Sequence, residues 1–143
     1  MQVFIVGSPL ETAKALDRLR LNKQIVEAEQ ILDALNGKTA WSNHPCTLQY
    51  KWYERWLGNY RACLMRYRAG LLDRAKVSSD VCDKMRPPFH TEQYFNQMKR
   101  RLYSKDPIFY AQWMNLGTSE VNWYYVDGEW RYYKNGKRVE ESI

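Results

Sequence analysis

Residues 8–37 read SPLETAKALDRLRLNKQIVEAEQILDALNG and decide the fold, because they contain both a start signal and a stop signal for a helix. Ser8 can cap the helix, Pro9 suits the first helical position, and Glu11 completes a capping box. Asn36-Gly37 supplies a left-handed stop. The stretch therefore predicts one long helix that begins at Pro9 and ends just before this pair.

Two stripes run along the predicted helix. The apolar stripe recurs every three or four residues and comprises Leu21, Ile25, Ala28, Leu32 and Leu35. A polar stripe with the same spacing lies roughly 80° round the helix, near the edge of the core, and comprises Asp17, Arg20, Gln24 and Glu27. Such a stripe forms either a ladder of surface ion pairs or a half-buried functional site, and both interpretations stay open.

Turn residues divide the rest of the helical region. The segments expected along it are, in order, an apolar stretch at 1–6, a loop at 41–45, a helix over about 47–69 closed by Gly70, a mixed region at 71–88 that ends in Pro87-Pro88, a helix over about 91–103, and a short helix from Asp106-Pro107.

The C-terminal region changes from helical to β character. Two aromatic runs, 122–126 and 129–133, flank Asp127-Gly128, which is a hairpin signature. Asn135-Gly136 offers a second turn, so that a three-stranded meander can form. The aromatic faces either bind bases or cover the helical core.

Length and composition fit a single domain. The 143 residues are 45% apolar and 15% aromatic, which suffices for a packed core and excludes global disorder. The expected fold is mainly α, with a compact helical domain at 1–117 and an aromatic β-hairpin or meander at 118–143 that extends the same domain.

No segment of the sequence has the length of apolar residues that a bilayer span needs. The cysteines Cys46, Cys63 and Cys82 are odd in number and lack metal-type spacing. We therefore expect reduced thiols in a cytoplasmic protein without a membrane partner.

The net charge of +6 is concentrated in two basic blocks. Residues 51–76 carry seven basic and two acidic side chains, and residues 84–106 carry six basic and two acidic ones. The first block interleaves its cations with Trp52, Trp56 and Tyr60, so that cations can neutralise phosphates while rings stack on bases. The alternative is a helix with a solvated charged face. Two blocks of one sign favour nucleic acid as the partner.

The sequence offers few groups for acid–base or metal chemistry. His44 and His90 are its two histidines, and both lie beside prolines in predicted loops, where a histidine serves either a structural or a functional role. Nitrogen and sulfur ligands are too sparse for a metal site. A Gly-rich phosphate loop, a nucleophile elbow and a Cys-X-X-Cys motif are all missing from the sequence. We therefore expect neither a metal nor another cofactor.

Several segments together resemble the pyrimidine-dimer DNA glycosylase/endonuclease V-like family, and most closely its branch of bacterial and phage proteins. The resemblance spans roughly residues 1–115, with the hairpin as an addition. It rests on residues 1–4, 16–28 and 41–45, on Trp52, Tyr60 and His90, and on Lys105-Asp106-Pro107 with Tyr110.

The resemblance implies a helical domain that binds duplex DNA, flips a nucleotide out of the stack and cuts its glycosidic bond. In the founding enzyme of the family an N-terminal α-amine attacks the sugar carbon to form a Schiff base, and β-elimination then nicks the strand. The corresponding amine here is that of Met1. The Arg-Glu pair of the family falls at about Lys23-Gln24, so that Glu27, one turn further on, or Asp17 would supply the carboxylate.

These inferences predict a base-excision enzyme, an N-glycosylase with abasic-site lyase activity on damaged or modified pyrimidines in duplex DNA. The expected catalytic residues are Glu27, Asp17, Met1, His44 and His90. The expected DNA-binding residues are Arg20, Lys23, Gln24, Asn43, Trp41, Trp52, Arg61 and Lys105. Either Trp41 or Trp52 would fill the gap that a flipped nucleotide leaves. We expect the protein to act as a monomer.

Three other functions stay open on the sequence alone. A non-catalytic nucleic-acid-binding module on the same fold would bind DNA in a salt-sensitive way without cleaving it. An enzyme with the same pocket would hydrolyse the N-glycosidic bond of free modified nucleotides. A protein-interaction domain would use the aromatic hairpin as its contact surface.

Overall fold

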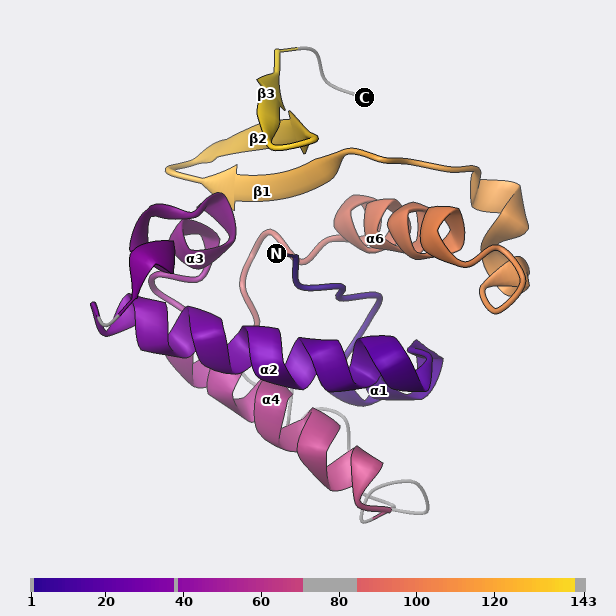
Figure 1. The fold of residues 1–143 in the computed structure, drawn as a ribbon, viewed down its shortest axis with the longest axis horizontal. Helices are drawn as coiled ribbons and strands as arrows, with labels where there is room; N and C mark the ends of the chain where they lie inside the picture. The colour runs from indigo at the N-terminus through magenta and orange to yellow at the C-terminus, as the bar shows by residue number, and fades with distance from the viewer. Residues whose placement is uncertain (1, 38, 71–84, 141–143) are drawn as a thin grey trace.

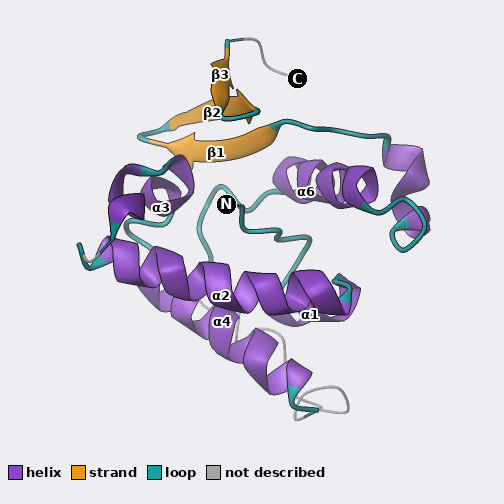
Figure 2. Cartoon of the chain, in the orientation of Figure 1, coloured by secondary structure: helices purple, strands orange, loops and turns teal. Residues whose placement is uncertain are grey.

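The computed structural model describes residues 2–37, 39–70 and 85–140. The chain is mainly helical and ends in a small antiparallel sheet, which confirms the predicted fold class (Figures 1 and 2). The helical elements are α1 (Pro9–Ala15), α2 (Arg18–Leu35), η1 (Ala40–Asn43), α3 (Pro45–Gln49), α4 (Glu54–Arg68), α6 (Glu92–Lys105) and η2 (Ala111–Leu116), where η marks a 3₁₀ helix. Within the described ranges no helix is both long and apolar enough to span a membrane.

The single long helix predicted from Pro9 onward is wrong, because the chain breaks between α1 and α2. Ser8 and Glu11 form the predicted capping box, but Leu16 and Asp17 are extended, with ψ angles of 139° and 159°. The backbone N–H of Asp17 donates to the Tyr110 hydroxyl at 2.9 Å instead of to a helical carbonyl. A contact with a residue 93 positions away thus decides where α2 starts.

The helix expected over 47–69 is also two helices. His44 caps α3 through its side chain, Pro45 is the first residue of that helix, and a turn separates it from α4. The turn lets the Tyr50 ring enter the core, where it stacks on Trp56 with ring centroids 5.9 Å apart, while Trp52 stays exposed. Burial of the Tyr50 ring overrides the continuous helical pattern of the sequence.

The predictions for the next segments are partly confirmed. The helix expected over 91–103 is α6, with Thr91 as its cap. The short helix expected from Asp106-Pro107 is instead a turn followed by η2, and the loop expected at 41–45 holds η1. Most of the mixed region predicted at 71–88 lies outside the described residues.

The N-terminal segment is extended and runs through the middle of the molecule between α2 and α6 (Figure 1). Its residues from Gln2 to Val6 are all buried, although none of them belongs to a strand. Side chains supply the hydrogen bonds that a neighbouring strand would otherwise provide. The Phe4 N–H donates to Gln24 Oε1 at 3.0 Å, and the Val6 N–H donates to Thr12 Oγ1 at 3.2 Å.

The C-terminal sheet is the predicted meander of β1 (Asn122–Val126), β2 (Glu129–Lys134) and β3 (Lys137–Val139). Asp127 and Gly128 both have positive φ, at 53° and 78°, as the tight turn between β1 and β2 requires. Trp123 and Tyr124 are 2% exposed and pack into the same core as the helices. The Tyr125 N–H donates to Gln49 Oε1 at 2.8 Å, which joins the hairpin to α3.

Replacing Gln24 by alanine is expected to lower the free energy of unfolding by about 3 kcal/mol or more, because several buried groups then lack partners at roughly 1–3 kcal/mol each. Urea unfolding at neutral pH measures this effect. Gln30→Ala is the matched control, because Gln30 is exposed on the same helix; its replacement should change stability by less than about 0.5 kcal/mol. Equal stability of the two variants would contradict the role of Gln24.

Candidate active site

Gln24 lies at the centre of the polar side of α2 and is only 2% exposed. Its Oε1 accepts from the Phe4 N–H and from the Tyr60 hydroxyl, at 3.0 and 2.8 Å. Its Nε2 donates to the Gln2 carbonyl at 2.7 Å and to Glu27 Oε2 at 3.2 Å. Both ends of the amide are therefore fully used inside the protein. The Gln24 side chain, which the sequence suggested as a DNA contact, is therefore buried and held by other groups of the protein.

Glu27 is the half-buried carboxylate of this site. It accepts hydrogen bonds from the Gln24 amide and from the backbone N–H of Gln2. Burial raises the pKa of the carboxyl group above its ordinary value, while the charges of Lys23 and Lys105 oppose the rise. Solvent still reaches this carboxyl group, and two donors hold it in place. A carboxyl group with a raised pKa in such a position is suited to acid–base chemistry.

Lys23 and Lys105 act electrostatically on Glu27, and the charges of Arg20 and Arg101 act on Lys105. We call this group the α2–α6 cluster; it comprises Arg20, Lys23, Glu27, Arg101 and Lys105. Burial lowers the pKa of Lys105, and the charges of Arg101, Arg20 and Lys23 lower it further, while Glu27 raises it. The Lys105 ammonium also lies 5.9 Å from the centre of the Phe4 ring. Arg20 is paired with Asp17, and the four cations together exceed the two carboxylates by two charges. An excess of this sign suits the binding of phosphates.

Arg101 belongs to the cluster but is not among the DNA-binding residues expected from the sequence. It is half-buried, and burial lowers its pKa. Its Nη1 donates to the Ser119 carbonyl at 3.5 Å. The signal for it was present in the sequence, since Arg101 and Lys105 stand four residues apart on the predicted helix over 91–103 and its end.

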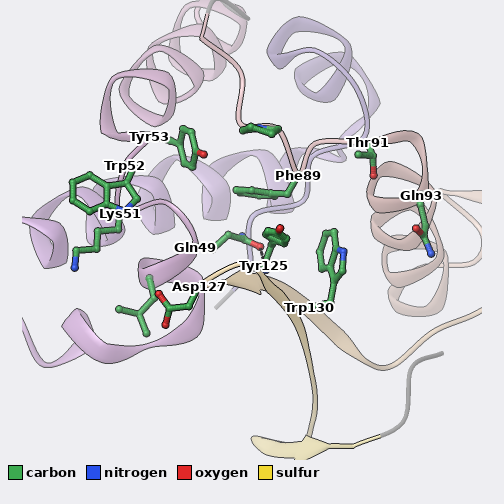
Figure 3. A pocket seen from close by; sticks show the side chains of 13 residues that line it. Gln49, Lys51, Trp52, Tyr53, Phe89, Thr91, Gln93, Tyr125, Asp127 and Trp130 are labelled. Atoms are coloured by element: carbon green, nitrogen blue, oxygen red, sulfur yellow. Dashed lines mark hydrogen bonds between the residues drawn. The ribbon is translucent and has the colours of Figure 1, made fainter.

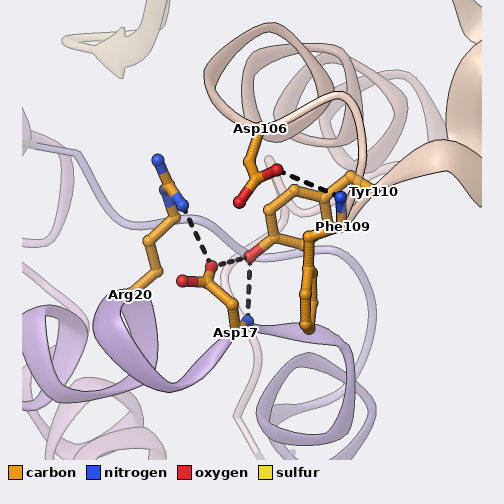
Figure 4. A network of polar contacts seen from close by, with 5 residues as sticks. All are labelled: Asp17, Arg20, Asp106, Phe109 and Tyr110. Atoms are coloured by element: carbon orange, nitrogen blue, oxygen red, sulfur yellow. Dashed lines mark hydrogen bonds and ion pairs between the residues drawn. The ribbon is translucent and has the colours of Figure 1, made fainter.

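Asp17 forms a separate network at the start of α2 (Figure 4). Its Oδ1 accepts from the Tyr110 hydroxyl and from Arg20 Nη1, the latter at 3.2 Å. Burial alone would raise the pKa of Asp17, but the hydrogen bonds from Tyr110 and Arg20 hold it below its ordinary value. Asp17 therefore stays ionised and orients Arg20 toward the α2–α6 cluster rather than serving as a proton donor.

His44 is half-buried at the start of α3. Its Nδ1 accepts from the Cys46 N–H at 3.0 Å, so that the neutral ring carries its hydrogen on Nε2. Burial lowers the pKa of the imidazole, which favours this neutral form. Tyr124 connects His44 to the α2–α6 cluster, because its ring lies 5.8 Å from the imidazole and its hydroxyl feels the charges of Arg101 and Glu27.

His90 does not join the cluster. It is 3% exposed, its Nε2 lies 2.8 Å from the Tyr50 hydroxyl, and its ring packs against Trp56 and Tyr94. Burial lowers the pKa of His90 well below its ordinary value, so that a neutral imidazole completes the aromatic core. The loop position that suggested a functional role reflects where the chain enters this core.

Arg61 is also apart from the cluster. Its Nε donates to the Ile25 carbonyl at 3.1 Å, and its Nη2 lies 3.1 Å from Glu29 Oε2. Positions 25 and 29 face the side of α2 that is opposite Glu27, given 100° per residue. Arg61 thus fastens α4 to α2.

The remaining predicted residues lie at the surface or beyond the described ranges. Trp41 and Asn43 are exposed on η1, whose Ser42 hydroxyl donates to the Ala34 carbonyl at the end of α2. Trp52 is 79% exposed in the turn between α3 and α4. Met1 lies outside the described residues.

A cavity of about 720 Å³ opens on another face of the molecule (Figure 3). Phe89, Tyr125 and Trp130 lie side by side in its wall, with Phe89 and Tyr125 stacked at 5.8 Å between ring centres. Trp52 stands at one end of it. None of the α2–α6 cluster lines this cavity. Among the described residues, no three His, Cys, Asp or Glu side chains form a group that could hold a metal ion.

The N-terminal part of the chain, which carries Gln24 and Glu27, is similar to a known family. Residues 1–67 match the family model of the pyrimidine dimer DNA glycosylases. This match confirms the family resemblance over those residues, which include α1, α2, α3 and nearly all of α4. Neither the curated proteins nor the solved structures gave a significant match.

Replacing Tyr110 by phenylalanine is expected to lower the free energy of unfolding by about 1–2 kcal/mol at pH 7, because Asp17 loses a donor and an acceptor. The pKa of Asp17 is depressed in the folded state, so its stabilisation is present above the unfolded value and is lost as pH falls through the folded value. The deficit of the variant should therefore shrink below about pH 4.

Urea unfolding of both proteins at pH 7 and pH 3 measures this difference. Tyr103→Phe is the matched control, because Tyr103 is a partly buried tyrosine on α6. A Tyr110→Phe deficit that is the same at both pH values would show that Asp17 does not depend on the Tyr110 hydroxyl.

Proposed function

We propose that this protein is a DNA N-glycosylase that removes damaged or modified pyrimidines from duplex DNA, with Glu27 as its catalytic carboxylate. The observation that carries the proposal is the position of Glu27, a half-buried carboxyl group of raised pKa among the cations of the α2–α6 cluster. Glu27 also lies in the segment that matches the pyrimidine dimer DNA glycosylases. The rest of the site follows from what DNA chemistry requires.

The cations bind the DNA backbone. Arg20, Lys23, Arg101 and Lys105 neutralise phosphates on either side of the target nucleotide. Phosphates near Glu27 raise its pKa further, because they repel the ionised form. DNA binding therefore converts Glu27 toward the protonated form that can donate to a leaving base.

An amine is the proposed nucleophile. Gln2 donates its backbone N–H to Glu27, and Met1 precedes Gln2 in the sequence. When Met1 carries a free α-amine, its ordinary pKa of about 7.7–8.0 leaves a useful neutral fraction near pH 7.5. The bond from this nitrogen to sugar C1′ forms as the bond from C1′ to the base breaks, and the base leaves with the electron pair and the proton of Glu27.

The lyase step uses the same carboxylate. The attached nitrogen gives one proton to Glu27, which is ionised after protonating the base. The lone pair of the nitrogen then forms a C1′=N bond as the C1′–O4′ bond breaks, and O4′ takes the proton back from Glu27. The resulting Schiff base acidifies the hydrogens on C2′. Ionised Glu27 takes a C2′ proton, and the electron pair expels the 3′ phosphate, so that the strand is nicked.

One observation favours a second candidate, a DNA-binding module without catalysis. The carboxylate of the family's Arg-Glu pair corresponds to about Gln24 here, and the Gln24 amide is fully used by the protein. If Glu27 does not replace that carboxylate, the cations alone remain. Such a module binds duplex DNA with strong salt dependence and releases no base.

Glu27→Gln is expected to reduce base release by about 100-fold or more, because general acid–base catalysis contributes on that scale, while DNA binding persists. The assay measures free base from a duplex that carries a pyrimidine dimer, with borohydride to trap a Schiff base and peptide mapping to locate it at Met1. Glu29→Gln is the matched control, because Glu29 lies on the opposite side of α2 and pairs with Arg61.

Full activity of the Glu27→Gln variant would remove Glu27 from the mechanism. Base release without a trapped band would replace the amine by activated water. A wild-type protein that binds the duplex in a salt-dependent way, with neither base release nor trapping, would establish the binding module.

The pH profile of strand nicking gives a separate prediction. The step that needs ionised Glu27 should slow as the pH falls, and this acid limb should lie above the ordinary carboxyl range because burial raises the pKa of Glu27. The charge of Lys105 opposes this rise of the pKa. Lys105→Met should therefore move the limb to higher pH. Lys99→Met is the matched control. Lys99 is on α6 like Lys105, but its ammonium lies over the Trp113 ring of η2. An acid limb that does not respond to Lys105→Met would contradict the assignment.

A further inference from the structure

The turn after α6 exposes two large apolar side chains. Ile108 is 91% exposed, the most of any large apolar side chain in the described residues, and Phe109 beside it is 53% exposed. Most of the Ile108 side chain and about half of Phe109 therefore lie outside the core. Side chains of this kind, gathered on one projecting segment, are typical of a contact surface.

The turn is held firmly at its base (Figure 4). Asp106 accepts from the Phe109 N–H at 3.0 Å through its side chain and from the Tyr110 N–H at 3.0 Å through its carbonyl. The Tyr110 ring is fully buried, and its hydroxyl donates to Asp17. The Phe109 ring packs edge-on against Tyr110 at 4.9 Å between centres. The two exposed side chains are therefore presented on a fixed support.

The charges around the turn indicate its partner. Lys105 ends α6 directly before Asp106, and Arg20 shares the Asp17 carboxylate with Tyr110. The apolar tip thus adjoins the positive surface of the α2–α6 cluster. A duplex offers the matching pattern, since its phosphates are anionic and the interior between its base pairs is apolar.

We propose that Ile108 and Phe109 form an apolar wedge that enters the base stack of bound duplex DNA and kinks it. The proposal rests on the proposed function in that the α2–α6 cluster binds the same duplex. Asp17, at the support of the wedge, precedes Glu27 by ten residues, or about 15 Å of helix. The proposal places the duplex axis along α2, so that at about 3.4 Å per base step the wedge enters four or five steps from the nucleotide at Glu27.

This position differs from the one predicted for a gap-filling side chain. Trp41 lies on η1 near the end of α2, whereas the wedge lies at the start of that helix. The role of the wedge is to bend the duplex, which opens the stack at a distance and lowers the cost of extruding the target nucleotide.

The test compares the wild type with a double variant that carries both Ile108→Ala and Phe109→Ala. A duplex with a donor and an acceptor fluorophore at its ends reports bending by energy transfer, and the same duplex carries a pyrimidine dimer for base release. A second duplex has a two-nucleotide gap at the expected kink, which makes it flexible without a wedge. Met65→Ala is the matched control, because Met65 is an exposed apolar residue on α4.

We expect the double variant to keep the salt dependence of binding but to lose the bend, and to release base about tenfold more slowly from the intact duplex. The gapped duplex should restore its rate, and the conservative variant Ile108→Leu should behave as wild type. A double variant that bends the duplex as the Met65→Ala control does would overturn the wedge.

The outcomes separate the wedge from the enzyme. A wild-type protein that binds and bends the duplex without releasing base would refute the glycosylase and leave the wedge supported by bending. A protein that does not bind the duplex would overturn both. A double variant with normal bending but altered sedimentation would assign the turn to a protein contact and overturn the wedge.

Discussion

The amide of Gln24 is the interaction on which the site depends. An extended segment in a protein core needs partners for its backbone groups, and 2–6 has no neighbouring strand to provide them. Gln24 supplies one donor to Gln2 and one acceptor to Phe4, and its remaining capacity goes to Tyr60 and Glu27. A single side chain thus sets both the path of the N-terminus and the orientation of the carboxylate, so that neither moves independently of the other.

The cations of the α2–α6 cluster repel one another, and the binding of an anionic partner would relieve this repulsion. Lys105 is partly desolvated and repelled by Arg101, Arg20 and Lys23, while Glu27 attracts it and Asp17 pairs with Arg20. Like charges held together on a folded surface oppose folding and favour the binding of a polyanion. The cluster also crosses the limits of the family match, since α2 lies within residues 1–67 and α6 lies outside them. The proposed phosphate contacts therefore combine a matched element with an unmatched one.

The composition leaves open whether the aromatic residues stack on bases or form the core. In the structure most of them belong to the core or pack against it. Trp56 and Tyr60 of the first basic block are fully buried and stacked at 5.3 Å, so that they cannot stack on bases. The hairpin buries Trp123 and Tyr124 against the helices, while Tyr125 and Trp130 border a separate cavity. An interleaved pattern of cations and aromatics is thus equally consistent with a helix that buries its rings and solvates its charges.

The sequence by itself determined the local features. The capping box of Ser8 and Glu11, the helix over Glu92–Lys105, the Asp127-Gly128 hairpin and the family resemblance all follow from residues close together in the chain. The tertiary structure alone decided the break at Asp17, the burial of Gln24 and the assembly of Arg101 and Lys105 around Glu27. These depend on partners far along the chain, such as Tyr110 and Gln2, and helical periodicity carries no record of which distant group will meet a given side chain.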